Sequence, residues 1–415
     1  MDSDSVQGID RRRLFKWGGL AAAGMAAGVP LVGAGIGRAH AAPTDSSGDD
    51  RIPRDALPGG AYDRHVAELA AEGRFSGVVL LSHRGRTVLS RSYGMADKEK
   101  GIPNREGTGF SLSSAGKPFH AVAILQLAQQ GKLRLSDTVG AHLTGFAEDV
   151  AGQVTIHHLL SGTSRLSSPD EDVQRVFQSR GEVHEYYEQR ARQADLMGVP
   201  GTPDTVHAEA EVTIAALIVE AVAGTTYWDY VRENIFKRCG MTGSAFHTRP
   251  QWLTDPHIAH PYMELADGSV VDGLRNLDQG SPYPYVLGKN PGRAFIDAPG
   301  DGGFATAPDL VRFAQALTDG TVLDRPWADV LFGAKTPHGP TSFGAYGLAI
   351  DIVNGQWEYQ RAGGNPGVGA NWSIYPYTGW VAVTLVNRDS DSLPDILEHQ
   401  TQAITGAARS GGAGG

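Results

Sequence analysis

The residues best suited to chemistry are a serine and a lysine three positions apart, Ser114 and Lys117. Residues at i and i+3 share one face of a helix, so the hydroxyl and the amine can come within hydrogen-bonding reach. This pairing suits nucleophilic catalysis, in which the serine attacks a carbonyl and the lysine is its base or electrostatic partner. The free N–H groups of a first helical turn would also favour negative charge near Ser114. The simpler interpretation is an N-capping serine followed by a solvated lysine.

The segment around this pair predicts where it lies in the fold. Residues 110–113 are predicted to be a short extended run, and the helix that follows is apolar almost all round, with Phe119, Val122 and Leu125 among its side chains. Such a helix is typically buried. A lysine so close to an apolar interior is costly to bury without a role, which favours the catalytic interpretation.

Composition limits the classes of function. The chain has 415 residues, of which 41% are apolar, so it has room for one large domain or two. Its single cysteine, Cys239, excludes an internal disulfide and is predicted to be a buried thiol. The net charge is −10, and no basic cluster follows the N-terminal region, which argues against a nucleic-acid partner. The histidine spacing indicates no metal site; the absence of a metal or organic cofactor is also what the family resemblance described below implies.

The N-terminal region has the order of a targeting segment. A twin-arginine pattern, residues 11–13, precedes a weakly hydrophobic glycine- and alanine-rich run and then the small-x-small sequence 39–41. Residues 1–41 are therefore predicted to be a twin-arginine signal peptide; the alternative is a transmembrane anchor. The mature protein is expected to be secreted, periplasmic or in the cell envelope, without a stable membrane anchor. Residues 42–60 are predicted to be a flexible spacer and 408–415 a disordered tail.

Strand-like runs occur at both ends of the remaining chain, and the stretch from about 117 to 317 between them is mostly helical. The predicted fold is α+β: an antiparallel sheet flanked by terminal helices, with an inserted all-helical lobe. The predicted strands are 77–82 and 86–93, joined as a hairpin, and 348–353, 357–360, 371–375 and 380–386; the predicted terminal helices are 62–71 and 393–407.

Several short motifs between residues 61 and 407 carry a resemblance to a known family. They are Tyr93-Gly94-Met95-Ala96-Asp97, the Ser114/Lys117 segment, Gly131-Lys132-Leu133, His158-Leu159-Leu160-Ser161-Gly162-Thr163-Ser164, Pro200-Gly201-Thr202, Gly302-Gly303-Phe304-Ala305-Thr306 and Gly363-Gly364-Asn365-Pro366-Gly367. With them the chain resembles the serine β-lactamase and penicillin-binding DD-peptidase superfamily, in the class C-like branch that includes esterases and acyltransferases. The resemblance implies an α/β sandwich beside a helical lobe, an active site between them, and an acylated Ser114 with Lys117 assisting proton removal.

The resemblance implies a second cluster, normally Tyr-x-Asn, which this chain replaces. Counted back from Gly224 the position falls on His207-Ala208-Glu209, and counted forward from Pro200 it falls on Val206-His207-Ala208. Valine cannot transfer a proton, whereas histidine is a good base near neutral pH, so His207 is predicted as the general acid/base. Glu209 is then expected near the lysine, keeping it protonated. The alternative is that both are solvated loop residues.

The third cluster of the family, normally Lys-Thr-Gly or His-x-Gly, becomes Arg361-Ala362-Gly363, followed by Gly364. Arginine offers a fork of donors suited to a substrate carboxylate, so Arg361 and Gly363 are predicted to bind substrate; the alternative is a solvated Arg361. The N–H groups of Gly364 and Ser114 are expected to form the oxyanion hole.

Two other features compete for a place in the site. His120 lies one turn beyond Lys117 and is interpreted as a helix-packing histidine. The segment Lys335-Thr336-Pro337-His338-Gly339 imitates the third cluster but lacks the glycine-rich turn and lies too far before the strand pair, so it is rejected.

The expected function is that of an exported serine hydrolase or acyltransferase, most consistent with an esterase, amidase or transacylase. Its expected partner is a small-molecule or peptide ester or amide, and a monomer is expected. Because both Tyr and Asn are replaced, efficient β-lactam turnover is not favoured. The alternative function is that of a catalytically inactive relative that binds or senses a ligand in the cell envelope.

Overall fold

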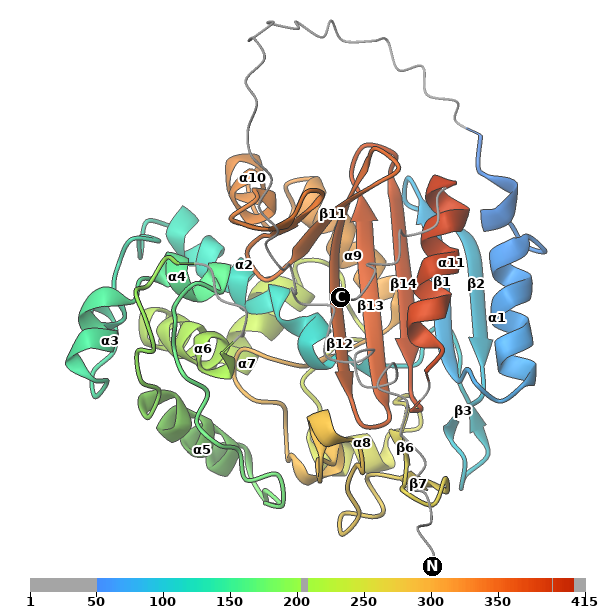
Figure 1. Cartoon of the computed structure of the whole chain (residues 1–415), viewed down its shortest axis with the longest axis horizontal. Coiled ribbons are helices and arrows are strands. Elements are labelled where there is room, and N and C mark those ends of the chain that lie inside the picture. Colours follow the sequence, from blue (N-terminus) through green and yellow to red (C-terminus); the bar gives the residue numbers. More distant parts are fainter. Residues whose placement is uncertain (1–50, 203–207, 390, 407–415) are drawn as a thin grey trace, which may run out of the picture.

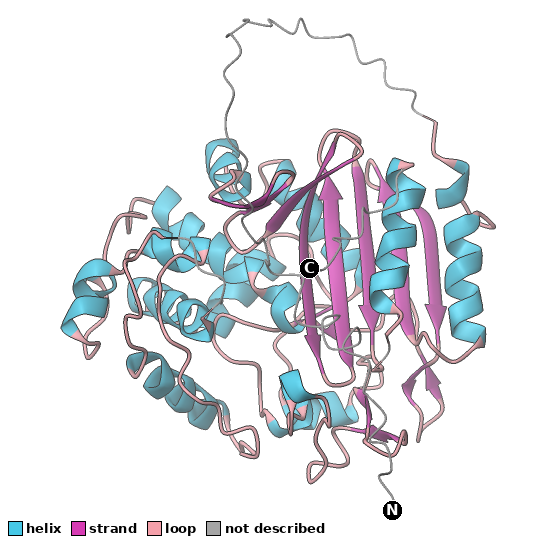
Figure 2. Cartoon of the chain, in the orientation of Figure 1, coloured by secondary structure: helices cyan, strands magenta, loops and turns pink. Residues whose placement is uncertain are grey.

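An eight-stranded antiparallel sheet forms one side of the molecule, and most helices lie on the other side (Figures 1 and 2). The computed structural model describes residues 51–202, 208–389 and 391–406. The strand order is β2-β1-β14-β13-β12-β11-β10-β9, which brings the two ends of the chain into one sheet as predicted. The strands are β1 (Gly77–His83), β2 (Arg86–Tyr93), β9 (Thr336–Gly339), β10 (Ser342–Gly344), β11 (Ala349–Val353), β12 (Gln356–Asn365), β13 (Val368–Tyr375) and β14 (Trp380–Val386).

The predicted strands are all present, and two further strands extend the sheet. The β1–β2 hairpin closes through Arg84 and Gly85, which have φ of 49° and 78°, the backbone that a two-residue hairpin turn requires. The extra strands β9 and β10 are short and contain Pro337 and two glycines, which conceal the alternation of a longer strand. Proline is compatible with an edge strand, and β9 lies at the sheet edge.

The two faces of the sheet are covered by different helices. Successive side chains of a strand point to opposite faces, and β1 follows this rule. Val79 and Leu81 pack with the terminal helices α1 (Ala61–Ala71) and α11 (Leu393–Thr405), whereas Val78 and Leu80 join the larger core on the other face. Both terminal helices were predicted, and they lie together on one face (Figure 1).

The segment between β2 and β9 is mostly helical and holds three small two-stranded sheets. Its helices are α2 (Pro118–Gln129), α3 (Glu148–Gln153), α4 (Ile156–Ser161), α5 (Arg180–Arg192), α6 (Glu209–Ala223), α7 (Tyr227–Val231), α8 (Arg249–Thr254), α9 (Ala307–Thr318) and α10 (Arg325–Phe332). The small sheets pair β3 (Met95–Asp97) with β4 (Ile102–Pro103), β5 (Phe110–Ser111) with β8 (Phe304–Ala305), and β6 (Tyr262–Glu264) with β7 (Val270–Asp272).

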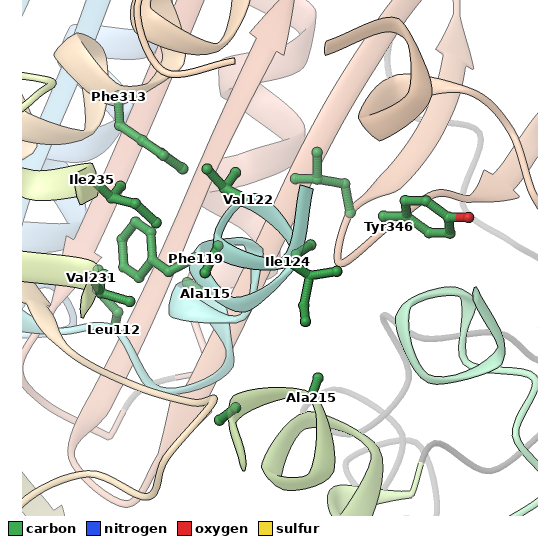
Figure 3. Close-up of a cluster of buried hydrophobic side chains, with 14 of the residues drawn as sticks. Leu112, Ala115, Phe119, Val122, Ile124, Ala215, Val231, Ile235, Phe313 and Tyr346 are labelled. Atoms are coloured by element: carbon green, nitrogen blue, oxygen red, sulfur yellow. The ribbon is translucent and has the colours of Figure 1, made fainter. Parts of the chain in front are cut away.

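Helix α2 is the centre of the larger core (Figure 3). Its residues from Pro118 to Ala128 are all buried, as the sequence predicts for a helix that is apolar all round. The ring of Phe119 meets Phe236 and Phe313 edge-on, each with centroids 5.0 Å apart. This packing fixes the start of α2, where Lys117 lies.

Two further sequence features find a place in the described parts of the chain. Cys239 is buried, and burial raises the pKa of its thiol to about 12, as expected for an inert core cysteine. No single helix among the described residues is long and apolar enough to cross a membrane. Helix α6 together with Tyr227–Phe236 reaches the length and composition, but the pair is bent by 76°.

Candidate active site

Ser114 lies in a tight 3₁₀ turn, Ser113–Gly116, between β5 and α2. The sequence predicts one continuous helix here, and the structure differs. In a 3₁₀ turn the side chains at i and i+3 eclipse one another, which brings them closer together than an α-helix does. The Nζ of Lys117 accordingly donates to the Oγ of Ser114 at 2.6 Å. The predicted nucleophile–lysine contact is therefore present.

The backbone just before the nucleophile is strained. Ser113 has φ of 48°, in the left-handed region that costs a non-glycine residue about 1–3 kcal/mol. Its hydroxyl donates to the carbonyl of Gly364 at 3.0 Å and accepts from Nδ2 of Asn365 at 3.1 Å. These two bonds attach the turn to the end of β12.

Lys117 is buried among charged groups, with only 1% of its side chain exposed. Its Nζ donates to Oδ2 of Asp301 at 2.8 Å and lies 3.6 Å from Oε1 of Glu209. Burial alone would raise the pKa of Asp301, but the Lys117 charge and hydrogen bond hold that pKa below its ordinary value. The amine beside the serine thus has an ionised carboxylate, Asp301, within hydrogen-bonding distance.

Asp301 was missed by sequence reasoning, although one signal was available. An acidic residue stands directly before Gly302-Gly303, a glycine pair already identified as a family motif. Its contact with Lys117 spans 184 positions, and no local pattern in the sequence predicts such a contact.

Glu209 lies where the count back from Gly224 places it, at the first residue of α6. That helix ends at Gly224, which has φ of 69° and caps it. The contact of Glu209 with Lys117 agrees with the register His207-Ala208-Glu209. His207 itself lies outside the described residues.

The strand β12 approaches the nucleophile so closely that only glycine fits at 363. A Cβ built on Gly363 would lie 2.2 Å from the carbonyl oxygen of Leu112 and 2.8 Å from the amide nitrogen of Ser114. Gly364 is exposed and follows in the same strand. The two predicted oxyanion-hole residues are therefore on adjoining backbones.

Arg361 contacts the nucleophile's own backbone. Its Nε donates to the carbonyl of Ser114 at 2.9 Å. Burial lowers the pKa of Arg361, and the carboxylates of Asp301 and Glu209 oppose that effect. Arg361 thus supports the turn of the nucleophile, a role the sequence did not predict, while its predicted binding of a substrate carboxylate stays a prediction.

His120 and Lys335 have structural partners. The Nδ1–H of His120 donates to the carbonyl of Gly300 at 3.1 Å, and burial and then the Lys117 charge lower its pKa to about 3, so the ring is neutral. Lys335 donates to the carbonyls of Val330 and Gly333, and burial lowers its pKa to about 8. Neither contact argues for a catalytic role.

A second carboxyl, the half-buried Asp297, lies beside the turn that carries Asp301. Its Oδ2 accepts from the N–H of Gly303 at 2.7 Å. Burial, with a smaller contribution from the Asp301 charge, raises the pKa of Asp297 to about 7. This carboxyl is therefore largely protonated in mildly acidic solution and ionised in alkaline solution.

Among the described residues, one group of side chains has the composition of a metal site: His65, Asp395 and His399. Asp395 pairs with His65 at 3.1 Å and with His399 at 3.2 Å. The two imidazole rings are stacked, with centroids 3.7 Å apart and an angle of 16° between planes. The group joins α1, which carries His65, to α11, which carries Asp395 and His399.

The fold and the site together define the penicillin-binding type of serine hydrolase: an antiparallel sheet, an inserted helical lobe and a Ser-x-x-Lys turn between them. The chain belongs to the Beta-lactamase family, whose model matches residues 62–406. It is 27% identical over 309 residues to the putative penicillin-binding protein PbpX of Bacillus subtilis, covering 74% of this chain and 68% of that protein.

Solved structures agree with this family. A penicillin-binding protein of Bacillus halodurans superposes with a TM-score of 0.68 at 25% identity, covering 80% of this chain and 98% of the other. EstCE1, described as a hydrolase with promiscuous acyltransferase activity, superposes with a TM-score of 0.66 at 23% identity, covering 83% of this chain and 97% of the other. The second likeness shows a shared fold.

We expect Gly363→Ala to destabilise the protein by about 1–3 kcal/mol, because its Cβ would overlap the backbone of the nucleophile turn. Urea unfolding measures the free energy of unfolding, and labelling with a fluorophosphonate measures the reactivity of Ser114. Gly339→Ala is the matched control, since Gly339 lies in the same sheet and a Cβ built on it would meet nothing within 4 Å. Equal stability of the two variants would contradict the close approach.

We expect Asp297→Asn to stabilise the protein at pH 8 by on the order of 2 kcal/mol and to have little effect at pH 4.5. The pKa of Asp297 is about 7 in the folded protein and lies above its value in the unfolded chain. The stability that this carboxyl contributes is therefore full at low pH and is lost as pH rises through 7. Urea unfolding at both pH values tests this. Asp278→Asn, at an exposed carboxylate, is the control. A loss of stability at both pH values would contradict the assignment.

Proposed function

We propose that this protein is an exported serine hydrolase or acyltransferase that forms an acyl-enzyme on Ser114. The observation that carries this proposal is the 2.6 Å contact between Ser114 Oγ and a buried lysine. A lysine side chain that is 1% exposed and is directed at a half-buried serine is better explained by a catalytic role than by a purely structural one. Export rests on the twin-arginine pattern in residues 1–41.

The proposed reaction has two halves. Ser114 Oγ attacks the carbonyl carbon of an ester or amide and gives its proton to a base, for which we propose His207. The oxyanion that forms is stabilised by the N–H groups of Ser114 and Gly364. When the tetrahedral adduct collapses, the C–O or C–N bond breaks and the leaving group takes a proton. Water or an amine then accepts the acyl group from Ser114.

The proposed substrates are esters and amides rather than β-lactams. Glu209, an anion, stands 3.6 Å from Lys117 where the family has a neutral asparagine. Ala362 lacks the hydroxyl that β-lactam-binding relatives use at this strand position. The hydrolase description of EstCE1, a structural neighbour, supports the same class of reaction.

Intact-mass spectrometry after incubation with a fluorophosphonate tests the proposal. We expect the wild-type chain to gain one label and Ser114→Ala to gain none. Ser269→Ala, at an exposed serine in the β6–β7 turn, is the matched control and should label like the wild type. A folded wild-type protein that stays unlabelled would instead favour a ligand-binding or sensing relative.

We expect His207→Ala to slow this labelling by roughly 10²- to 10⁴-fold, the usual contribution of a general base. Val206→Ala is the control for the alternative register and should label within a few-fold of the wild-type rate. Time courses followed by mass spectrometry give both rates. If His207→Ala labels as fast as the wild type, the base is another group.

A further inference from the structure

Asp301 is carried by a turn that glycine alone can build. Gly300, Gly302 and Gly303 have φ of 95°, 69° and 94°, all in the left-handed region. A Cβ on Gly300 would lie 2.1 Å from the carbonyl oxygen of Val212, and a Cβ on Gly302 would lie 2.3 Å from the side chain of Asp297. The residue between these glycines therefore has a backbone position fixed from both sides.

The same turn is attached to the nucleophile segment. A Cβ on Gly116 would lie 1.8 Å from the carbonyl oxygen of Gly302, so the two backbones are in direct contact. His120 holds the carbonyl of Gly300 at 3.1 Å. Oδ1 of Asp301 accepts from the N–H of Gly302 at 2.8 Å, which orients Oδ2 towards Lys117. The carboxylate is thus held in place at both oxygens.

Asp301 and Glu209 are not equivalent partners of Lys117. The Asp301 side chain is 19% exposed and makes a hydrogen bond of 2.8 Å, whereas Glu209 is 54% exposed and stands at 3.6 Å. An exposed ion pair contributes little, while a close and largely buried one acts in a lower dielectric. Asp301 is therefore the dominant counter-charge.

We propose that Asp301 is a positioning residue for the acyl transfer, which holds Lys117 as an ammonium ion aimed at Ser114. This inference rests on the proposed function. Lys117 then acts as a fixed positive charge that stabilises the negative charge developing on Ser114 Oγ. Since an ammonium cannot accept a proton, the proton of Ser114 passes to a different base.

Other charged groups face this pair from each element packed against it. Arg361 approaches from β12, Glu209 from α6, and the neutral His120 from α2. Asp297 and the buried Tyr227 also interact electrostatically with Asp301. These groups include one more cation, so removing Asp301 leaves Lys117 beside Arg361 with only the half-exposed Glu209 in compensation.

The test is the pH dependence of fluorophosphonate labelling between pH 6 and 10 for the wild type, Asp301→Asn and Glu209→Gln. Asparagine keeps the shape of the turn and removes the charge. We expect Asp301→Asn to label at least tenfold more slowly at pH 8, with the alkaline limb of its profile at least one pH unit lower than that of the wild type. Glu209→Gln should shift the limb by less. Circular dichroism and urea unfolding check that each variant is folded.

The outcomes separate this inference from the proposed function. A wild-type protein that labels on Ser114, together with an Asp301→Asn profile that matches it, would overturn the role of Asp301 alone. Faster labelling of Asp301→Asn at pH 8 would also overturn it, because it would mean that neutral Lys117 is the base. A wild type that does not label would overturn the acyl-enzyme proposal, and the role of Asp301 with it. If the Asp301→Asn variant does not fold, Asp301→Glu replaces it. Because glutamate retains the charge, we expect its alkaline limb to match that of the wild type, and an alkaline limb at lower pH than that of the wild type would contradict the proposal.

Discussion

A buried lysine side chain held against a carboxylate is the constraint on which this site depends. Lys117 is almost fully removed from water, and an uncompensated charge in such a place is costly by several kcal/mol. The protein supplies a hydroxyl at 2.6 Å and a carboxylate at 2.8 Å, one from the same turn and one from a distant segment. The compensation that makes burial possible also directs the lysine at the serine.

Close backbone contact is the means by which these groups are brought together. Gly116 and Gly363 let the turns 300–303 and the strand β12 approach the nucleophile segment more closely than any side chain would allow. The strained Ser113 persists because two hydrogen bonds from the end of β12 hold it. The sheet and the helical region thus meet at main-chain atoms, which vary less in position than side chains.

The replacements in the second and third clusters leave a site of balanced charge. Two cations, Lys117 and Arg361, lie among two anions, Asp301 and Glu209. Such a site retains an aimed serine and donors on adjoining backbones, and under our proposal the proton acceptor is a group other than the lysine. This arrangement is consistent with acyl transfer in a family whose members differ in substrate, because a fold alone does not specify the reaction.

The sequence by itself determined the sheet strands at both ends, the terminal helices, the buried α2 and the Ser114–Lys117 pair. Each of these shows in the local sequence, either as a pattern of side chains over a short segment or as a spacing of three positions. It also placed Glu209 by counting from a helix-capping glycine. The edge strand β9, its neighbour β10 and the 3₁₀ turn were not predicted, since proline, glycine and short length conceal them. Only the tertiary structure decided the partner of Lys117: Asp301 is 184 residues away, and folding alone brings two such distant residues within hydrogen-bonding distance.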